Sequence, residues 1–384
     1  MKILLVSEFS YPSGYRTLAE ALAFGLVAKG HEVVVLGKDD NGLEHDYPFA
    51  VHPTQVEFVP QHMARLAGIV QPDWVALLMD VPKQVSVLNN LFVVDPAFYS
   101  KYKIASLFPV ESDPFSDKWR FTLQLRTTIR FVFTEFGKKT CEAAGLRVHK
   151  LPIGLSSTCY APAQQTNMDK PYILTVAANQ PRKNLPGAME IAAKAIKNRR
   201  DAGLDLSFIL ITDPDSKDGW DLRQTVREMN KAYGVGDAIT VIDRSGVSPQ
   251  ALRIFYANAA VLLLTSIAEG IGLPIYEAQA QGCPVVATNC CAIPEAVKEG
   301  ALIDVEAVTP YAWGNTRHYW PSIEDGTKKV LAAIALPHKP VMYGLTTTMA
   351  QYFISILSAF DSAVENVKQE QTQEQTTGSV ATSA

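Results

Sequence analysis

The sequence has few cysteines, and none of them is spaced for a metal site or a disulfide framework. The five cysteines stand at positions 141, 159, 283, 290 and 291, without a CxxC pair or a spaced set of cysteine and histidine. Zinc modules and small disulfide-stapled folds depend on such spacing. The sequence therefore argues against both classes and favours a reducing compartment, so that we expect a cytoplasmic protein.

Long apolar runs and a large excess of one charge are also missing. Near the N-terminus only Ile3–Val6 is apolar, which is too short for a signal-peptide core or a membrane span. The formal net charge is −4, which gives no general attraction to nucleic acid or to anionic membranes. A nucleic acid is therefore not the expected partner, while a peripheral contact with a membrane stays open.

The chain has the length and composition of a globular protein with two domains. It has 384 residues, of which 47% are hydrophobic and 19% are charged, and single cores stop growing at about 250–300 residues. Strand and helix patterns alternate twice, over residues 1–155 and over residues 171–345, which predicts parallel sheets with helices on their faces. We predict an α/β fold of two Rossmann-like, doubly wound parallel-sheet domains that face each other across a cleft.

Three segments outside the two domains differ in composition. Residues 156–170 are rich in Ser, Thr, Gln and Pro, which is typical of a linker. A helical run at residues 346–367 is long enough to pack back on the first domain, and an ordinary terminal helix of the second domain fits its periodicity equally well. Residues 368–384 lack apolar periodicity, so that we expect a disordered tail.

A glycine loop framed by two glutamates is the most informative part of the sequence. It reads EGIGLPIYE at residues 269–277 and follows an apolar strand at Val261–Thr265. The glycines let backbone amides approach a ligand, and Pro274 suits the first turn of a helix whose N-terminus favours an anion. The carboxylates of Glu269 and Glu277 can accept hydrogen bonds from vicinal hydroxyls. The pattern predicts a site for a phosphate and a sugar or ribose.

Further phrases around the loop indicate a family. Ser266 precedes the loop, and GCPVVA follows it at residues 282–287. PRKNL at residues 181–185 and LRIFYAN at residues 252–258 stand before it. Together they resemble the retaining glycosyltransferases of family four, which have the GT-B fold. The signature of that family is a Glu, seven residues and a second Glu, followed by Gly-x-Pro-Val-Val-Ala.

The resemblance covers residues 1 to about 310, and it is densest in the second domain. In the first domain, TEFGK at residues 134–138 and PIGL at residues 152–155 match the family more weakly. The resemblance implies transfer of a sugar from a UDP-, GDP- or ADP-sugar to a hydroxyl acceptor, with retention of the anomeric configuration. It also implies that the donor binds mainly to the second domain and the acceptor mainly to the first.

Individual roles follow from the same resemblance. Glu269 would contact the donor sugar, Glu277 the ribose, and Lys183 the diphosphate. A fixed ammonium and a helix terminus can stabilise the leaving diphosphate, so that neither a metal nor another cofactor is expected. The full set of candidate donor-binding residues is Gly14, Arg16, Arg182, Lys183, Ser266, Glu269, Gly270, Ile271, Gly272, Leu273 and Glu277.

Two phosphate-binding features of the family are reduced in this sequence. The family's Gly-Arg at the end of the first strand of the second domain corresponds to Ala177-Ala178. Arg182, beside Lys183, and Arg16, at the start of a helix, are candidates for the missing contact. The first-domain glycine loop is reduced to SGYR at residues 13–16, which leaves Gly14 as a backbone contact.

The family's first-domain histidine has no counterpart either. The corresponding loop reads FPVESDP at residues 108–114 and offers Glu111 and Asp113 instead. We predict that these carboxylates act as a general base or orient the acceptor, and the alternative is a pair of solvated loop side chains. With Glu269 and Lys183, they complete the set of candidate catalytic residues.

Other functions fit part of the pattern. A GT-B epimerase or hydrolase would consume a nucleotide sugar without an acceptor, and a nucleotide-sugar-binding partner subunit without turnover would explain the missing Arg and His. A dinucleotide oxidoreductase is disfavoured, because residues 6–17 lack GxGxxG. Soluble sugars, proteins, lipids at a membrane face and a nucleic-acid base stay open as acceptors.

Overall fold

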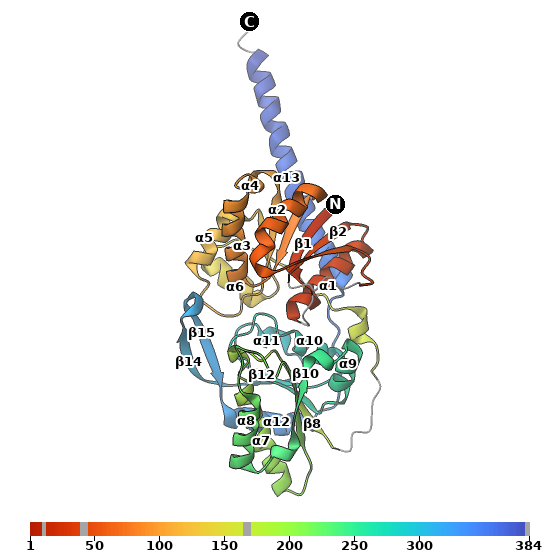
Figure 1. The fold of residues 1–384 in the computed structure, drawn as a ribbon, viewed down its shortest axis with the longest axis vertical. Coiled ribbons are helices and arrows are strands. Elements are labelled where there is room, and N and C mark those ends of the chain that lie inside the picture. The colour runs from red at the N-terminus through yellow and green to blue at the C-terminus, as the bar shows by residue number, and fades with distance from the viewer. Residues whose placement is uncertain (10–12, 39–44, 164–169, 381–384) are drawn as a thin grey trace.

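The computed structural model describes residues 1–9, 13–38, 45–163 and 170–380, and it shows two parallel sheets stacked end to end with helices on their faces (Figure 1). The first sheet has seven parallel strands in the order β3-β2-β1-β4-β5-β6-β7. They are β1 (Lys2–Glu8), β2 (Glu32–Lys38), β3 (Ala50–Thr54), β4 (Trp74–Leu78), β5 (Lys103–Leu107), β6 (Ile129–Val132) and β7 (His149–Lys150).

The second sheet has six parallel strands in the order β10-β9-β8-β11-β12-β13. They are β8 (Tyr172–Val176), β9 (Ser207–Thr212), β10 (Ile239–Asp243), β11 (Val261–Leu264), β12 (Val285–Thr288) and β13 (Gly300–Ile303). An antiparallel hairpin of β14 (Val305–Tyr311) and β15 (Thr316–Pro321) follows. The predicted α/β fold with two doubly wound parallel sheets is confirmed.

Helices cover both sheets. Around the first sheet lie α1 (Gly14–Ala28), α2 (Val59–Val70), α3 (Val81–Val94), α4 (Phe98–Lys101), α5 (Asp117–Arg126) and α6 (Glu135–Ala143). Around the second lie α7 (Leu185–Asp201), α8 (Leu222–Tyr233), α9 (Pro249–Asn258), α10 (Leu273–Ala280), α11 (Ile293–Ala296) and α12 (Ile323–Ala333). The chain ends with α13 (Thr346–Val380).

The middle of β1 is a continuous apolar run because both of its faces are covered. In β1, Ile3 and Leu5 join the buried cluster that α1 contributes to, while Leu4 and Val6 join the cluster on the opposite face, with residues of α2 and α3. A strand buried on both faces gives a continuous hydrophobic run instead of an alternating one. The short apolar run Ile3–Val6 therefore forms the middle of β1.

The C-terminal helix α13 lies against the first domain (Figure 1). A Cβ on Gly25 of α1 would lie 2.6 Å from the carbonyl oxygen of Thr346, so that glycine permits the close approach of the two helices. Phe353 packs on Phe131, with 5.1 Å between ring centroids, and the indole of Trp74 donates a hydrogen bond to Asp361. The helix therefore ties the end of the chain to the first sheet.

Several elements differ from the sequence-based expectation. Residues 368–380 continue α13, and the disorder that we expect for residues 368–384 stays a prediction; residues 381–384 lie outside the described part. Strand β3 contains Pro53 at the sheet edge, and the hairpin is largely exposed, so that neither showed strand periodicity. Within the described residues, none of the helices is long and apolar enough to cross a membrane.

Candidate active site

The predicted glycine loop lies where the second domain meets the first. Gly272, with φ of 76°, is the N-cap of α10, a left-handed conformation that favours glycine. A Cβ on Gly270 would lie 2.7 Å from the Cβ of Pro109 in the first domain, so that glycine is needed for this contact. The amides of residues 270–273 donate to no acceptor that the structure describes. They are therefore available to an anion at the start of α10.

Glu269 is the centre of a cationic cluster. Lys183 Nζ lies 2.5 Å and Arg182 Nη1 3.8 Å from its Oε2, and the Ser266 hydroxyl donates to the same oxygen at 3.0 Å. The other oxygen, Oε1, makes no hydrogen bond with the residues in the described part of the chain. One carboxylate oxygen is thus fixed by the protein, and the other can accept a hydroxyl of a ligand.

The charges of this cluster shift one another's protonation. Burial raises the pKa of Glu269, but Lys183 and Arg182 lower it more strongly, so that it falls to about 2. Burial and the neighbouring Arg182 lower the pKa of Lys183. Glu269 is therefore an anion at neutral pH, and an anionic ligand would relieve the repulsion between the two cations.

Arg182 also reaches the first domain. Its Nη2 lies 2.6 Å from Glu111 Oε1, and its Nη1 donates to the carbonyl of Ala268. Burial raises the pKa of Glu111; Arg182 opposes this rise, and Asp80 and Glu269 add to it. Glu111 is therefore no solvated loop carboxylate, because it is half-buried and paired across the two domains.

Glu277 lies apart from the Glu269 cluster. It is half-buried on α10 and accepts a hydrogen bond from the Tyr256 hydroxyl at 2.9 Å. Burial raises its pKa, which Tyr256 and Arg244 partly oppose. The two glutamates of the loop thus occupy different surroundings, as separate contacts to a sugar and to a ribose would require.

Of the two predicted residues in α1, one lies at the glycine loop and the other is paired elsewhere. Gly14 lies against the loop, since a Cβ there would be 3.4 Å from Leu273 Cδ1. Arg16 instead donates to Glu20 and to the Tyr47 hydroxyl, so that Arg182 is the arginine at the Glu269 cluster.

Asp113 is bound by the β14–β15 hairpin. Arg317 Nη1 lies 3.3 Å from its Oδ2, and the Tyr319 hydroxyl donates to its Oδ1. The neighbouring Ser112 donates to the carbonyl of Arg317 at 2.6 Å. The hairpin therefore spans the two domains and holds the loop that carries Glu111. The sequence analysis missed it, because an exposed hairpin leaves no apolar signal.

Two first-domain residues at the site were also missed. The Tyr15 hydroxyl donates a hydrogen bond to Asp80, and it lies within the electrostatic reach of Glu111 and Arg182. Asp80 follows the apolar strand β4 after one intervening residue, Met79. That position, at the carboxyl end of a parallel strand, is the signal that could have identified it.

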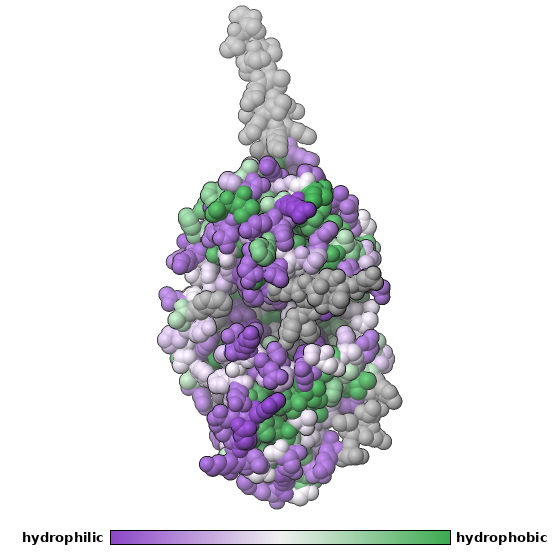
Figure 2. Space-filling model, viewed as in Figure 1, coloured by the Kyte–Doolittle hydropathy of each residue, from purple (hydrophilic) through white to green (hydrophobic). Residues whose placement is uncertain are grey.

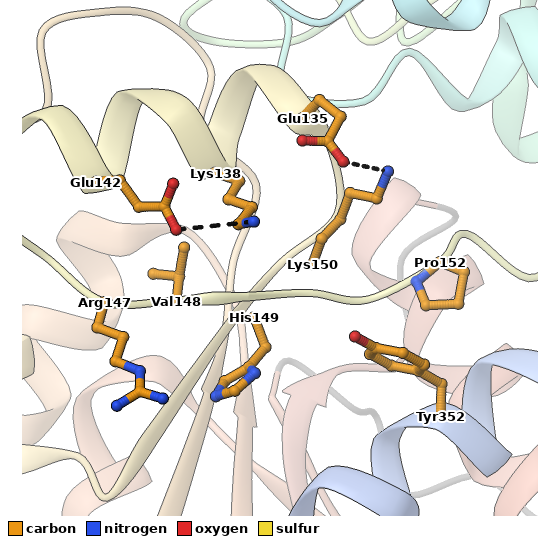
Figure 3. A pocket seen from close by; sticks show the side chains of 9 residues that line it. All are labelled: Glu135, Lys138, Glu142, Arg147, Val148, His149, Lys150, Pro152 and Tyr352. Atoms are coloured by element: carbon orange, nitrogen blue, oxygen red, sulfur yellow. Dashed lines mark ion pairs between the residues drawn. The ribbon is translucent and has the colours of Figure 1, made fainter.

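The surface between the domains is hollowed, and hydrophilic side chains surround the visible part of the hollow (Figure 2). A separate surface cavity of about 500 Å³ lies between α6, β7 and α13 (Figure 3). Ion pairs join Lys150 to Glu135 and Lys138 to Glu142 along it, and none of the predicted site residues lines it. In the described part of the chain, no group of three His, Cys, Asp or Glu side chains could hold a metal ion.

Comparison with known proteins shows similarity in sequence to part of this chain. Residues 160–314 match the family model described as "Glycosyl transferases group 1". The MMP alpha-(1->4)-mannosyltransferase of Mycolicibacterium hassiacum is 26% identical over 151 residues, which are 39% of this chain and 33% of that protein. The D-inositol 3-phosphate glycosyltransferase of Nocardia farcinica is 27% identical over 163 residues, 40% of this chain and 35% of that protein. The chain thus aligns with about a third of the length of these curated relatives.

The likeness in fold extends over nearly the whole chain. The solved structure of sucrose-phosphate synthase from Thermosynechococcus elongatus superimposes with a TM-score of 0.65, over 94% of this chain and 99% of that chain, at 16% identity. The structural likeness shows the fold, and the match to the family model shows the similarity in sequence. The protein therefore has the GT-B fold, and its residues 160–314 match the family model of the glycosyl transferases group 1.

Proposed function

We propose that the protein transfers a sugar from a nucleotide-sugar donor to a hydroxyl acceptor, with retention of configuration at the anomeric carbon. One observation carries the proposal: Lys183 and Arg182 converge on Glu269 beside the amides of residues 270–273, which have no acceptor among the described residues. A diphosphate needs cations and amide donors, and a sugar needs a carboxylate that accepts its hydroxyls. Both requirements are met within one loop.

In the donor complex, Lys183 and Arg182 bind the diphosphate together with the amides at the start of α10. Glu269 then accepts a sugar hydroxyl through Oε1, and Glu277 accepts the ribose hydroxyls. The two cations supply the positive charge that a divalent metal would otherwise bring, so that we propose a reaction without metal or other cofactor. The nucleobase is uracil, guanine or adenine, which the experiment below distinguishes.

In the transfer step, the acceptor oxygen forms a bond to the anomeric carbon, while the bond from that carbon to the β-phosphate oxygen breaks. The electron pair of the broken bond stays on the diphosphate, where Lys183 and the N-terminus of α10 stabilise it. The acceptor proton moves to the leaving phosphate on the same face of the sugar, either directly or by way of Glu111, which takes the proton and passes it on. Attack and departure on one face retain the configuration.

Glu111 orients the acceptor or takes its proton. In the structure without ligand it is paired with Arg182, and a bound diphosphate would compete for that arginine. Glu111 would then face the acceptor as a carboxylate with a raised pKa, which suits a general base. Asp113 positions the Glu111 loop through Arg317 and Tyr319.

We place this activity in the cytoplasm, because all five cysteines are free thiols. A lipid acceptor would require a peripheral contact with a membrane, and a soluble acceptor would not.

Thermal unfolding with a panel of UDP-, GDP- and ADP-sugars tests the proposal, because a ligand of the native state raises the melting temperature by mass action. We expect a shift with sugars of one nucleotide, and its loss in Lys183→Ala and Glu277→Ala. No shift with any donor, or unchanged shifts in both variants, would contradict the proposed site. Full donor consumption without acceptor would favour a hydrolase or epimerase, and binding without turnover on any acceptor would favour a non-catalytic subunit.

A further inference from the structure

The cavity between α6, β7 and α13 lies at the edge of the first sheet, away from the candidate active site (Figure 3). Its volume of about 500 Å³ is in the range of sites for small molecules. Among the described residues that line it, Val148 and Pro152 alone are aliphatic, and most of the others are charged. A small polar ligand therefore fits the cavity better than a lipid chain.

Three neighbouring side chains in the cavity have polar groups without a partner. Arg147 and His149 are two residues apart where the chain enters the edge strand β7, so that they point to the same side, and Tyr352 lies on that side on α13 (Figure 3). Val148, between them, points the other way into the buried cluster. Within the described part of the chain, the guanidinium of Arg147, the ring nitrogens of His149 and the hydroxyl of Tyr352 make no hydrogen bond or ion pair. They are therefore available to a ligand.

The charge around these side chains is positive. The two lysine–glutamate pairs along the cavity balance their own charges. Arg147 is left without a carboxylate, and the neighbouring Arg130 of β6 donates to the carbonyl of Leu123, while its buried Nε has no partner among the described residues. Burial lowers the pKa of His149, and the two arginines and then Lys138 lower it further. The arginines thus leave an excess of positive charge that an anion would neutralise.

The shape of these groups favours a phosphate ester over a monatomic anion. A guanidinium is a planar fork that can bind two oxygens of one phosphate, and the imidazole of His149 can donate to a third. The cavity is large enough to hold an organic part beyond the phosphate. The side of Tyr352 that faces the cavity offers a flat apolar ring and a hydroxyl to that part, since this residue is 39% exposed.

We propose that this cavity is a second ligand site, separate from the donor site, and that it binds a small phosphorylated molecule. Arg147 and His149 bind the phosphate group, and Tyr352 contacts the organic part. The ligand thereby joins the edge strand of the first sheet to α13. The inference does not rest on the proposed sugar transfer, since none of the candidate donor-binding residues lines the cavity.

The test measures the binding of phosphate compounds to the full chain by isothermal titration. Inorganic phosphate, glycerol 3-phosphate and glucose 6-phosphate are compared with glycerol and glucose. We expect at least one ester to bind with a dissociation constant below about 1 mM, and its unphosphorylated parent not to bind. Arg147→Gln should weaken the binding of the ester and of inorganic phosphate about tenfold or more, because it removes hydrogen bonds to a charged group. Tyr352→Ala should weaken the ester about threefold or more and leave inorganic phosphate unchanged.

The pKa of His149, followed by NMR of its ring protons, shows where the ester binds. It should rise on binding, because a neighbouring anion favours the imidazolium form, and His149→Gln identifies the signal. The matched control is Arg65→Gln, since Arg65 is an exposed arginine on α2 without a partner among the described residues. This variant and Lys183→Ala, which alters the donor site, should both bind the ester like the wild type.

Four results would overturn the proposal. The first is that none of the three phosphate compounds binds. The second is an equal loss of binding in Arg65→Gln and Arg147→Gln, which would mean nonspecific attraction to surface cations. The third is loss of binding in Lys183→Ala, which would place the ester in the donor site. The fourth is an unchanged pKa of His149 in the presence of a bound ester.

Discussion

Arg182 of the second domain and Glu111 of the first form an ion pair across the two domains, with 2.6 Å between Nη2 and Oε1. The same guanidinium lies 3.8 Å from Glu269, so that one arginine contacts a carboxylate of each domain. A diphosphate would compete with both carboxylates for this cation. Donor binding and the position of the acceptor-side loop are therefore coupled through Arg182.

Replacing Glu111 tests this coupling. In Glu111→Gln, we expect kcat to fall about 100-fold or more, as is usual for loss of a general base. Donor affinity should stay equal or increase slightly, because Arg182 no longer has a competing carboxylate. Burial raises the pKa of Glu111, so that the wild-type rate should fall with decreasing pH at a higher pH than for an ordinary glutamate. The variant should lack this acidic limb.

The measurements are kcat against pH and the equilibrium affinity for the donor. Glu142→Gln, an exposed glutamate on α6 that pairs loosely with Lys138, is the control and should behave as the wild type. A variant with unchanged kcat and an unchanged pH profile would remove Glu111 from the mechanism.

Lys183 and Glu277 should act on different parts of the donor. In Lys183→Ala, we expect the nucleoside diphosphate to bind about 10- to 100-fold more weakly and the free nucleoside to bind as before, because a charge-assisted contact is lost. In Glu277→Ala, both ligands should bind more weakly. Isothermal titration of each ligand into each variant distinguishes the two roles.

Lys197→Ala is the control for Lys183→Ala. Lys197 lies on α7, the helix that follows Lys183, but it pairs with Asp201 at the surface. Equal losses for nucleoside and diphosphate in Lys183→Ala would contradict the assignment of this residue to the phosphates.

The part of the candidate site that lies in the second domain was predictable because most of its residues are close in sequence. The loop at residues 269–277 combines glycine, proline and glutamate in an order that itself fixes a strand, a turn and a helix N-terminus. Lys183 was predictable only through the resemblance, since its contact with Glu269 joins two segments that are far apart in the chain. Local chemistry thus predicts a loop, and family patterns extend it to long-range partners.

The part of the candidate site that lies in the first domain depends on contacts between distant segments, which no local sequence pattern shows. Asp80 and Tyr15 come from separate segments, and only the order of strands β1 and β4 in the sheet brings them together. The choice between Arg16 and Arg182 likewise required the structure, because Arg16 is held by Glu20 and Tyr47. Sequence reasoning named both arginines but had no physical basis for choosing one.

The hairpin should stabilise the association of the two domains. Tyr319→Phe removes the hydroxyl that donates to Asp113, a loss of about 2 kcal/mol for a hydrogen bond to a charged group. We expect faster amide hydrogen exchange in residues 111–119 and 305–321, together with a lower kcat. Tyr311→Phe on the neighbouring strand β14 is the control, because the exposed Tyr311 stacks on His318 and a phenylalanine keeps that contact. Unchanged exchange in both segments would show that the hairpin does not hold the Glu111 loop.

Glu269 should make the free energy of unfolding depend on pH in the acidic range. Its pKa is about 2 in the folded state and 4.5 as an ordinary value, so that the unfolded chain binds a proton first as the pH falls. The stabilisation by Glu269 is therefore complete above pH 4.5 and is lost as the pH falls toward 2, and between pH 6 and pH 3 the loss is about 2 kcal/mol.

Urea unfolding at several pH values should show this decrease in the free energy of unfolding of the wild type, in addition to the decrease that the other carboxylates cause. In Glu269→Gln, the loss of unfolding free energy between pH 6 and pH 3 should be about 2 kcal/mol smaller than in the wild type, whatever the stability of the variant at pH 6. The exposed control Glu142→Gln should show the same loss as the wild type. Parallel curves for the wild type and Glu269→Gln would mean that Lys183 and Arg182 do not hold the Glu269 charge in the folded protein.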